Sequence, residues 1–289
     1  MIDASDQVGG GNAAQIAYWN DKAAVTWTTF QEHIDTVFAP LTAVALDAAA
    51  PATGERVIDV GCGCGATVLE LARRVGPTGH VLGLDVSEPM SARARERIAA
   101  EKMGNAKVVV DDAATYASPR DDADLLFSRF GVMFFADPAA AFANLRLAMR
   151  PGGRLLCMAW RPLAENPWFT VPMEAARPLL PPQPPPEPYA PGPFAFADAE
   201  RVRGILAAAG WREASIVRHD KPMRLAGVGQ LDAATEFATR VGPLARALAE
   251  VDADLRSRAR QAVREALRAS DGPSGIWLAG SIWLVAAGA

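Results

Sequence analysis

The 289-residue sequence predicts an α/β fold in which a parallel β-sheet is flanked by helices. Between residues 56 and 160, short runs rich in β-branched residues alternate with segments of helical periodicity, which is typical of such a sheet. The first run ends in three glycines at every second position, at the sheet edge where these folds bind ligands. Hydrophobic residues make up 50% of the chain, enough to bury one sizeable core or two modest ones.

The first predicted unit is a strand, a glycine turn and a helix. The strand is the apolar run at 57–60, interrupted only by Asp59. The segment after the turn repeats apolar residues at the spacing of one helical face: Val68, Leu71, Ala72 and Val75. We therefore expect a buried strand whose carboxyl end presents the glycines, followed by an amphipathic helix.

Three more strands are expected at 81–86, 107–110 and 124–128. A helix is predicted after the first of them, because Ser87 stands at an N-cap position and Pro89 in the first turn. Its apolar positions again follow helical spacing: Met90, Ala94 and Ile98. Strands and helices thus continue to alternate, as connections between parallel strands require.

A further helix and a fifth strand end the alternating region. Pro138 begins the helix, and the strand is expected at 154–160. One face of the helix is predicted to hold Phe142, Leu145 and Met149. The Pro-Gly-Gly sequence at 151–153 is predicted to be the turn that closes the helix before the strand begins.

The composition changes after residue 160. Twelve of the 22 prolines lie between Pro162 and Pro193, which argues against long regular elements in this segment. A disordered linker is one interpretation of so much proline. The segment also holds more aromatic residues than a water-exposed linker would: Trp168, Phe169, Tyr189, Phe194 and Phe196. We therefore predict a loop that covers part of the fold.

The rest of the chain is predicted to add helices and two strands. A helix that ends at Gly210 is indicated by periodic apolar residues: Val202, Ile205, Leu206 and Ala209. A sixth strand is expected near 214–218 and a seventh, the last, at 276–289. Two or three helices are expected within 231–270.

Charge and hydropathy exclude several classes of function. The net charge of −4 gives no basic footprint for nucleic acid, whose binding depends on Lys and Arg contacts to phosphate. The N-terminal residues lack the basic and apolar regions of a secretory signal. The apolar run at 276–289 is shorter than the roughly 20 residues that span a bilayer, and three cysteines suggest no disulfide framework. We expect a cytoplasmic protein that binds neither nucleic acid nor membrane.

The glycine turn narrows the ligand to two classes. Gly61, Gly63 and Ala66 match the G-x-G-x-x-G/A pattern of dinucleotide sites, and Asp85 follows at the distance of about 20 residues expected of a ribose-binding acid. S-adenosylmethionine also offers a ribose to Asp85, and its amino-acid end needs hydrogen bonds from a glycine-rich turn. Glycines suit either ligand, because the missing Cβ lets it approach the backbone. The turn alone therefore leaves both classes open.

The wider pattern resembles the class I S-adenosylmethionine-dependent methyltransferases, most closely the small-molecule branch that includes the quinone-biosynthesis C-methyltransferases. The resemblance covers about residues 56–160, with a weaker echo at 207–211 and in the last strand. It depends on five ordered stretches: VIDVGCGCGATVLELA, VLGLDVSEPM, VVVDDAATY, DLLFSRFGVMFFADP and LRLAMRPGGRLLCMAW. The resemblance implies a Rossmann-like, mostly parallel sheet of seven strands whose last strand is antiparallel, with a helical and loop cap.

The resemblance also implies which residues bind S-adenosylmethionine. The set comprises Gly61, Cys62, Gly63 and Gly65 along the methionine part, Asp59 holding the turn, Asp85 at both ribose hydroxyls, Val86 and Met90 beside the adenine, Asp112 and Ala113 at the adenine ring, and Arg129 through its backbone. The Arg129 side chain departs from the small residue that the family pattern leads us to expect.

Methyl transfer from a sulfonium requires that the acceptor be held close, aligned and partly dry. A base is needed only where the acceptor is protonated. Of the three histidines, His33 is the candidate for catalytic contact, because the N-terminal helical segment often folds over the cofactor in this family. Tyr18 could donate a hydrogen bond, and with Trp19 and Trp27 it could close the methionine side of the site.

The implied organisation is an N-terminal helical lid at 1–52 and a methyltransferase domain at 53–289, with cap insertions at about 161–196 and 221–275. The apolar character of the lid and caps predicts a small hydrophobic or aromatic acceptor. Cys62 and Cys64 have no second Cys/His pair nearby, so no metal is expected. The remaining alternatives are an NAD(P)-dependent oxidoreductase and a protein that binds S-adenosylmethionine without catalysis; no oligomeric state is indicated.

Overall fold

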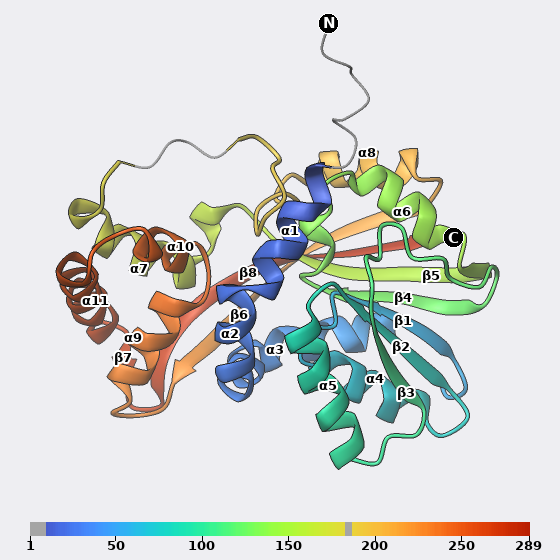
Figure 1. The fold of residues 1–289 in the computed structure, drawn as a ribbon, viewed down its shortest axis with the longest axis horizontal. Coiled ribbons are helices and arrows are strands. Elements are labelled where there is room, and N and C mark those ends of the chain that lie inside the picture. The colour runs from blue at the N-terminus through green and yellow to red at the C-terminus, as the bar shows by residue number, and fades with distance from the viewer. Residues whose placement is uncertain (1–9, 183–186) are drawn as a thin grey trace, which may run out of the picture.

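The structure is a computed structural model that describes residues 10–182 and 187–289. The predicted lid at 1–52 and the predicted cap at 161–196 each include residues outside these ranges. A twisted sheet occupies the middle of the molecule, with helices on both faces and a second group of helices at one end (Figure 1).

The sheet has the order β3-β2-β1-β4-β5-β8-β6. Its strands are β1 Arg56–Val60, β2 His80–Asp85, β3 Ala106–Val110, β4 Ala123–Arg129, β5 Met149–Trp160, β6 Arg212–Ala226 and β8 Gly275–Gly288. The first five strands pair in parallel, whereas β8 runs antiparallel to both of its neighbours, β5 and β6. This arrangement confirms the predicted Rossmann-like fold. A two-residue strand that was not predicted, β7 Asp271–Gly272, also pairs with β8.

Helices cover the two faces of the sheet. In Figure 1, α3, α4 and α5 lie below the sheet and α6 and α8 above it. Their bounds are α3 Gln31–Ala49, α4 Ala66–Val75, α5 Glu88–Ala100, α6 Pro138–Arg146 and α8 Ala199–Ala208. The predicted apolar face of α4 is buried throughout, and the Ser87 hydroxyl accepts the Met90 N–H to cap α5 as predicted.

The site lies where the strand order reverses. β1 lies between β2 and β4, so the crossovers from these strands leave to opposite faces and open a crevice at their carboxyl ends. The strands around this point are apolar on both sides: Leu125, Leu126 and Phe127 of β4 are all 0% exposed. The buried sheet therefore holds the ends of β1, β2 and β4 in fixed positions.

The Pro-Gly-Gly sequence at 151–153 is not the turn that was predicted. It lies inside β5, and Met149 is the first residue of that strand rather than part of α6, which ends at Arg146. Gly152 has a φ of 82°, which places an irregularity in the strand. The register with β4 shifts at the same place, since Ala123 pairs with Met149 while Leu125 pairs with Arg154.

The proline-rich segment contains a regular helix that the sequence analysis did not predict, α7 Pro167–Ala176. Its first residue is a proline, and at that position the missing N–H has no intrahelical partner to lose. Trp168 and Phe169 are 2% and 4% exposed, so burial of these rings stabilises the helix despite Pro172 within it. The predicted covering role of the segment agrees with this burial.

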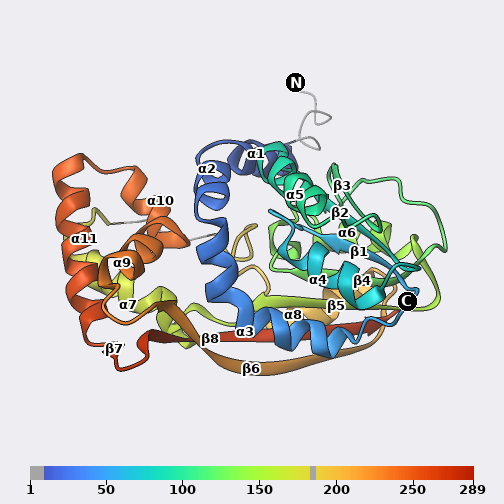
Figure 2. The same cartoon turned by 90° about the horizontal axis from the view of Figure 1, so that it is seen from below.

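The remaining helices form the group at one end of the molecule. They are α9 Leu231–Arg240, α10 Pro243–Ala249 and α11 Ala253–Arg268, in agreement with the two or three helices expected. With α7 they pack around the end of β6 and the beginning of β8 (Figure 2). β6 is much longer than the predicted 214–218, because its pairing with β8 continues as far as Ala226.

Candidate functional site

The glycine turn between β1 and α4 depends on glycine at its first and last positions. Gly61 and Gly65 have φ values of 69° and 82°, in the left-handed region that favours glycine. A Cβ on Gly61 would lie 2.6 Å from the Cα of Gly131, and one on Gly65 would lie 2.9 Å from the Cβ of Ala94. The turn is therefore packed closely against the segment that follows β4 on one side and against α5 on the other.

Hydrogen bonds from the turn to acceptors in β2 hold the turn in place. The Gly61 and Cys62 N–H groups donate to the Leu84 carbonyl at 2.8 and 3.2 Å. The Asp85 carboxylate accepts from the N–H groups of Gly63 at 2.8 Å and Ser87 at 2.9 Å. Each carboxylate oxygen keeps a further lone pair for a ligand hydroxyl. Burial raises the pKa of Asp85 above its ordinary value, although the hydrogen bonds it accepts oppose this shift.

Asp59, the residue implied by the family resemblance to hold the turn, lies in β1. Its carboxylate is 0% exposed and accepts a hydrogen bond from the Thr67 hydroxyl in the first turn of α4. Burial raises the pKa of Asp59 to about 7, with the Thr67 hydrogen bond acting in the opposite direction. Asp59 therefore ties β1 to α4 without lining the cavity above the turn.

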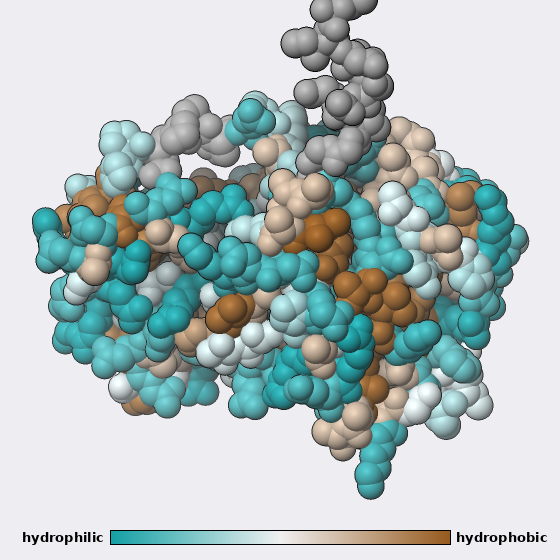
Figure 3. Space-filling view, viewed as in Figure 1, coloured by the Kyte–Doolittle hydropathy of each residue, from teal (hydrophilic) through white to brown (hydrophobic). Residues whose placement is uncertain are grey.

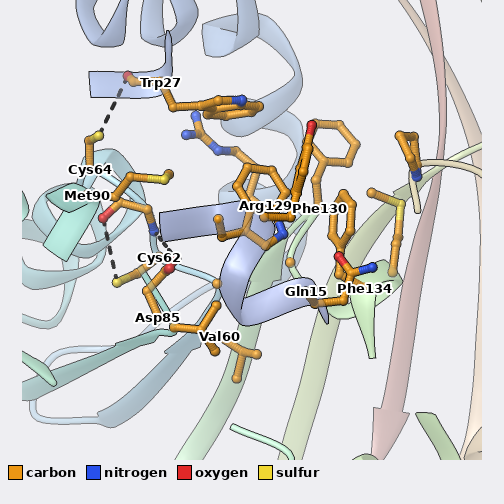
Figure 4. Close-up of a pocket in the computed structure, with 18 of the residues that line it drawn as sticks. Gln15, Trp27, Val60, Cys62, Cys64, Asp85, Met90, Arg129, Phe130 and Phe134 are labelled. Atoms are coloured by element: carbon orange, nitrogen blue, oxygen red, sulfur yellow. Dashed lines mark hydrogen bonds between the residues drawn. The ribbon is translucent and has the colours of Figure 1, made fainter. Parts of the chain in front are cut away.

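A cavity of about 280 Å³ opens above the turn and the ends of β2 and β4. The structure brings most of the predicted cofactor-binding residues to its wall: Gly61, Cys62, Gly63, Asp85, Val86, Met90, Asp112, Ala113 and Arg129. Gly65, like Asp59, lies outside the lining. Figure 4 shows Asp85 and Cys62 on one side of the cavity and Phe130 and Phe134 on the other.

The two N-terminal helices α1 Gly10–Asn20 and α2 Lys22–Thr29 lie over this cavity. The Asn12 amide of α1 donates to the Asp112 carboxylate, and Asn20 donates to the Val86 carbonyl at 2.8 Å. The Asn20 amide oxygen accepts the Glu88 N–H at 3.0 Å. These asparagines were not predicted, because nothing in their spacing connects them with β2 or β3.

Helix α1 is a cover rather than part of the buried core. Hydrophobic residues gather beside it on the face seen in Figure 3. Ile16 and Tyr18 of this helix remain 37% and 39% exposed, although both also line the cavity. The helix thus closes one wall of the cavity while its other side faces solvent.

Besides Tyr18, nine aromatic residues of the described chain line the cavity. They are Trp19, Trp27, Phe38, Phe130, Phe134, Phe135, Trp160, Trp168 and Phe169. Phe130 stacks on Trp160 with ring centroids 4.1 Å apart and an angle of 11° between the planes. Phe130 also has a φ of 65°, an uncommon conformation for a bulky residue that tends to occur at functional sites. We call these nine rings the aromatic chamber.

The two predicted catalytic residues have different positions. Tyr18 lines the cavity, and the Arg246 guanidinium of α10 lies 4.7 Å from the centre of its ring. His33 does not line this cavity. Its Nε2 donates to the Leu225 carbonyl at 2.6 Å, and its ring lies 5.0 Å from that of Phe237. The geometry therefore does not favour catalytic contact by His33, since α3 directs it towards β6 and α9.

Two further predictions were that the protein binds no metal ion and does not enter a membrane. Within residues 10–182 and 187–289, no cluster of three or more His, Cys, Asp or Glu residues could hold a metal ion. Burial raises the pKa of Cys62 well above its ordinary value and that of Cys64 to about 12, so both thiols stay protonated. Over the same described ranges, no helix is long and apolar enough to cross a membrane.

Comparison with known families adds the decisive observation. Residues 57–153 match the family described as "Methyltransferase domain". The chain contains a class I S-adenosylmethionine-dependent methyltransferase domain. The match begins with β1 and ends within β5, so it contains the glycine turn, Asp85 and Asp112. Of the two ligand classes left open by the turn, this family favours S-adenosylmethionine over a dinucleotide.

Curated relatives of the methyltransferase domain act on small molecules according to their names. Aklanonic acid methyltransferase DauC from Streptomyces sp. (strain C5) is 33% identical over 50% of this chain and 62% of its own. Nocamycin O-methyltransferase from Saccharothrix syringae is 38% identical over 41% of this chain and 42% of its own. Demethylmenaquinone methyltransferase from Geobacillus kaustophilus (strain HTA426) is 31% identical over 36% of this chain and 45% of its own. The chain thus spans less than two thirds of each relative.

A solved structure shares the fold beyond the methyltransferase domain. The crystal structure of the [4+2]-cyclase SpnF has a TM-score of 0.55 and 16% sequence identity, over 92% of this chain and 95% of that one. At this identity the similarity concerns the fold alone. It extends the likeness to the strands and helices outside residues 57–153.

The residues around the turn fit S-adenosylmethionine. A Cβ on Gly63 would lie 3.0 Å from the Met90 Cε, and both residues line the cavity. Asp85 combines a carboxylate in the wall with N–H partners that fix its orientation, which suits a pair of ribose hydroxyls. The uncharged apolar surface of Met90 in the same wall suits an adenine ring.

Proposed function

We propose that this protein transfers a methyl group from S-adenosylmethionine to a small hydrophobic or aromatic acceptor, at an oxygen or carbon atom. The single observation that carries the proposal is that the aromatic chamber and the glycine turn with Asp85 line one continuous cavity. Bound S-adenosylmethionine supplies an electrophilic methyl group on a sulfonium.

The chain's own residues divide the work of holding the cofactor. Gly61 and Gly63 bring bare backbone to the amino-acid end, and Asp85 accepts hydrogen bonds from the ribose. Met90 and Asp112 flank the adenine, where Asn12 fixes the Asp112 carboxylate from the lid side. All of these roles follow from the family motif combined with the position of each residue in the cavity wall.

The aromatic chamber is proposed to bind the acceptor. Its rings exclude water and offer flat faces to an aromatic ligand, and the stacked pair of Phe130 and Trp160 limits the orientations that the ligand can take. Close and aligned placement is the main contribution that a methyl-transfer site makes. The names of two relatives, aklanonic acid methyltransferase and demethylmenaquinone methyltransferase, support a small-molecule acceptor.

Tyr18 is the residue that we propose for contact with the acceptor or the amino-acid end of the cofactor. Its hydroxyl belongs to α1, which lies over the cavity, and Arg246 approaches its ring from α10. The proposed division into a lid at 1–52 and a domain at 53–289 with two caps agrees with this position, since cavity residues come from all these segments.

The test has two stages. Calorimetry first measures whether S-adenosylhomocysteine binds, with NAD and NADP as competing ligands. Labelled S-adenosylmethionine is then incubated with a panel of phenols, quinones and aromatic carboxylic acids. Transfer of label to an aromatic acceptor is the expected result. Binding of S-adenosylhomocysteine with no transfer to any member of the panel would indicate a non-catalytic binding protein, and binding of NAD alone would indicate an oxidoreductase.

A further inference from the structure

Three charged side chains meet beside the glycine turn, and the family motif assigns none of them a role. Asp35 of α3 and Arg129 of β4 line the cavity, and Arg97 of α5 lies behind them. The side chains of Asp35 and Arg97 are each 21% exposed, and that of Arg129 is 11% exposed. Charges so little exposed are stable only when partners surround them.

The contacts between these side chains form a connected network. An Arg97 nitrogen lies 3.0 Å from one Asp35 carboxylate oxygen, and an Arg129 nitrogen lies 3.7 Å from the other. Arg97 also donates to the Cys64 carbonyl at 2.7 Å, which ties the network to the glycine turn. Arg129 donates to the Thr42 hydroxyl at 3.1 Å. The Arg129 guanidinium is thus held at the cavity wall from α3.

The charges in direct contact within this network do not balance, although Arg129 also acts through space on the Asp59 carboxyl. Two guanidinium groups share one carboxylate, and within the described part of the chain no second carboxylate lies within 4.0 Å of either. Asp35 is moreover shared with Gln31, whose amide donates to it at 2.6 Å. The separation of 3.7 Å between Arg129 and Asp35 is long for a charge-assisted hydrogen bond. Arg129 therefore keeps donors for an anion inside the cavity.

The anion that best matches this arrangement is a carboxylate. A guanidinium presents a planar fork of N–H groups that fits a carboxylate through two parallel hydrogen bonds. Given the proposed function, one carboxylate is always brought to the glycine turn, that of the amino-acid end of S-adenosylmethionine. We propose that the Arg129 side chain, positioned by Asp35 and Thr42, binds this carboxylate. The role differs from the backbone contact that the family resemblance implied for the same residue.

An acidic acceptor is the other possible source of a carboxylate, and ligand pairs separate the two. S-adenosylhomocysteine carries the amino-acid end, whereas 5′-methylthioadenosine has the same adenine, ribose and thioether sulfur but lacks it. Neither compound carries the sulfonium charge, so repulsion between that charge and Arg129 does not enter the comparison. The ratio of the two dissociation constants therefore measures recognition of the amino-acid end alone.

The experiment is calorimetric titration of both compounds into the wild type and the variant Arg129→Met. We expect the affinity for S-adenosylhomocysteine to fall about tenfold to a hundredfold, as for a lost hydrogen-bonded charge pair. The affinity for 5′-methylthioadenosine should change less than about threefold. Arg129→Lys, which keeps the charge, should retain part of the preference for S-adenosylhomocysteine and also serves if the Met variant fails to fold.

Arg93→Met is the matched control. Arg93 comes from the same helix as Arg97 and donates to Gln31, but it is 38% exposed and does not line the cavity. This variant should bind both compounds like the wild type. An unchanged ratio of affinities in Arg129→Met, with both compounds still bound, would overturn the inference and leave the proposed function intact. Failure of the wild type to bind either compound would instead contradict the proposed function.

Discussion

The two halves of the cavity are built in different ways. The half formed by the glycine turn and β2 is held by backbone N–H groups that donate to Leu84 and Asp85, all from residues within one β-α-β unit. The aromatic chamber is formed by rings from α1, α2, α3, α7, the segment after β4 and the end of β5. Some of these rings pack edge to face, and Phe130 stacks on Trp160. Backbone geometry fixes the first half and side-chain packing the second, so the two should respond differently to substitution.

The largest expected effect is a loss of cofactor affinity on substitution of Asp85, in the half of the cavity formed by the glycine turn and β2. The variant Asp85→Ala removes the carboxylate proposed to accept two ribose hydrogen bonds, each worth about 1.5–3 kcal/mol. Affinity for S-adenosylhomocysteine should fall at least about a hundredfold, as measured by calorimetry. Asp122→Ala, which removes an exposed carboxylate paired with Arg56, should leave the affinity unchanged. Equal affinities for the two variants would show that Asp85 does not bind the ribose.

A smaller effect is expected from the buried carboxyl beneath the turn. Burial raises the pKa of Asp59 from 3.8 in the unfolded chain to about 7 in the folded protein. Between these values the folded state keeps a proton that the unfolded state has lost, so this group lowers the free energy of unfolding as the pH rises from about 4 to 7. The change amounts to about 2–4 kcal/mol.

Urea unfolding of the wild type and of Asp59→Asn across this pH range measures that contribution. The Asn variant keeps an oxygen for the Thr67 hydroxyl but has no proton to lose. Its stability relative to the wild type should therefore increase as the pH rises towards 7. Parallel pH profiles for the two proteins would mean that Asp59 is not protonated in the fold.

The chamber can be tested apart from the cofactor half at Phe134. Its ring lines the cavity 5.0 Å from Trp19 and is only partly buried, so Phe134→Ala removes wall surface with limited damage to the core. We expect kcat/KM for the aromatic acceptor to fall about tenfold while affinity for S-adenosylhomocysteine stays within about twofold. A loss of cofactor affinity with unchanged acceptor kinetics would reverse the assignment of the two halves.

The smallest expected effect concerns the lid, which joins the halves. Asn20→Ala removes the hydrogen bonds to Val86 and Glu88 that fasten α1 to β2, and these are solvent-exposed. We expect affinity for S-adenosylhomocysteine to fall about threefold. The control Asn105→Ala also removes two side-chain hydrogen bonds, to the Ala72 and Gly76 carbonyls, which are partly buried and lie at the opposite edge of the sheet. A drop of equal size in the control would mean that the effect is one of general stability.

The predicted site residues line one cavity where they are close neighbours in the chain. The glycine turn follows β1, Asp85 ends β2 and Met90 lies in the helix after it, and all of them except Gly65 line the cavity. His33, by contrast, does not line the cavity, because the rotation of a helix about its axis decides whether a side chain meets the cavity. The helix α7 was also missed, since burial of Trp168 and Phe169 outweighs the poor helical propensity of the prolines around them.

The sequence by itself determined the alternation of strands and helices, the bare backbone after β1 and the acid at the end of β2, because these features depend on local spacing. Only the tertiary structure decided which rings from distant segments enclose the chamber. It also decided that Arg129 lines the cavity wall and shares Asp35 with Arg97. The reason is physical: hydrogen bonds of a turn are fixed by adjacent residues, whereas contacts among side chains far apart in the chain exist only once the sheet and its helices have packed.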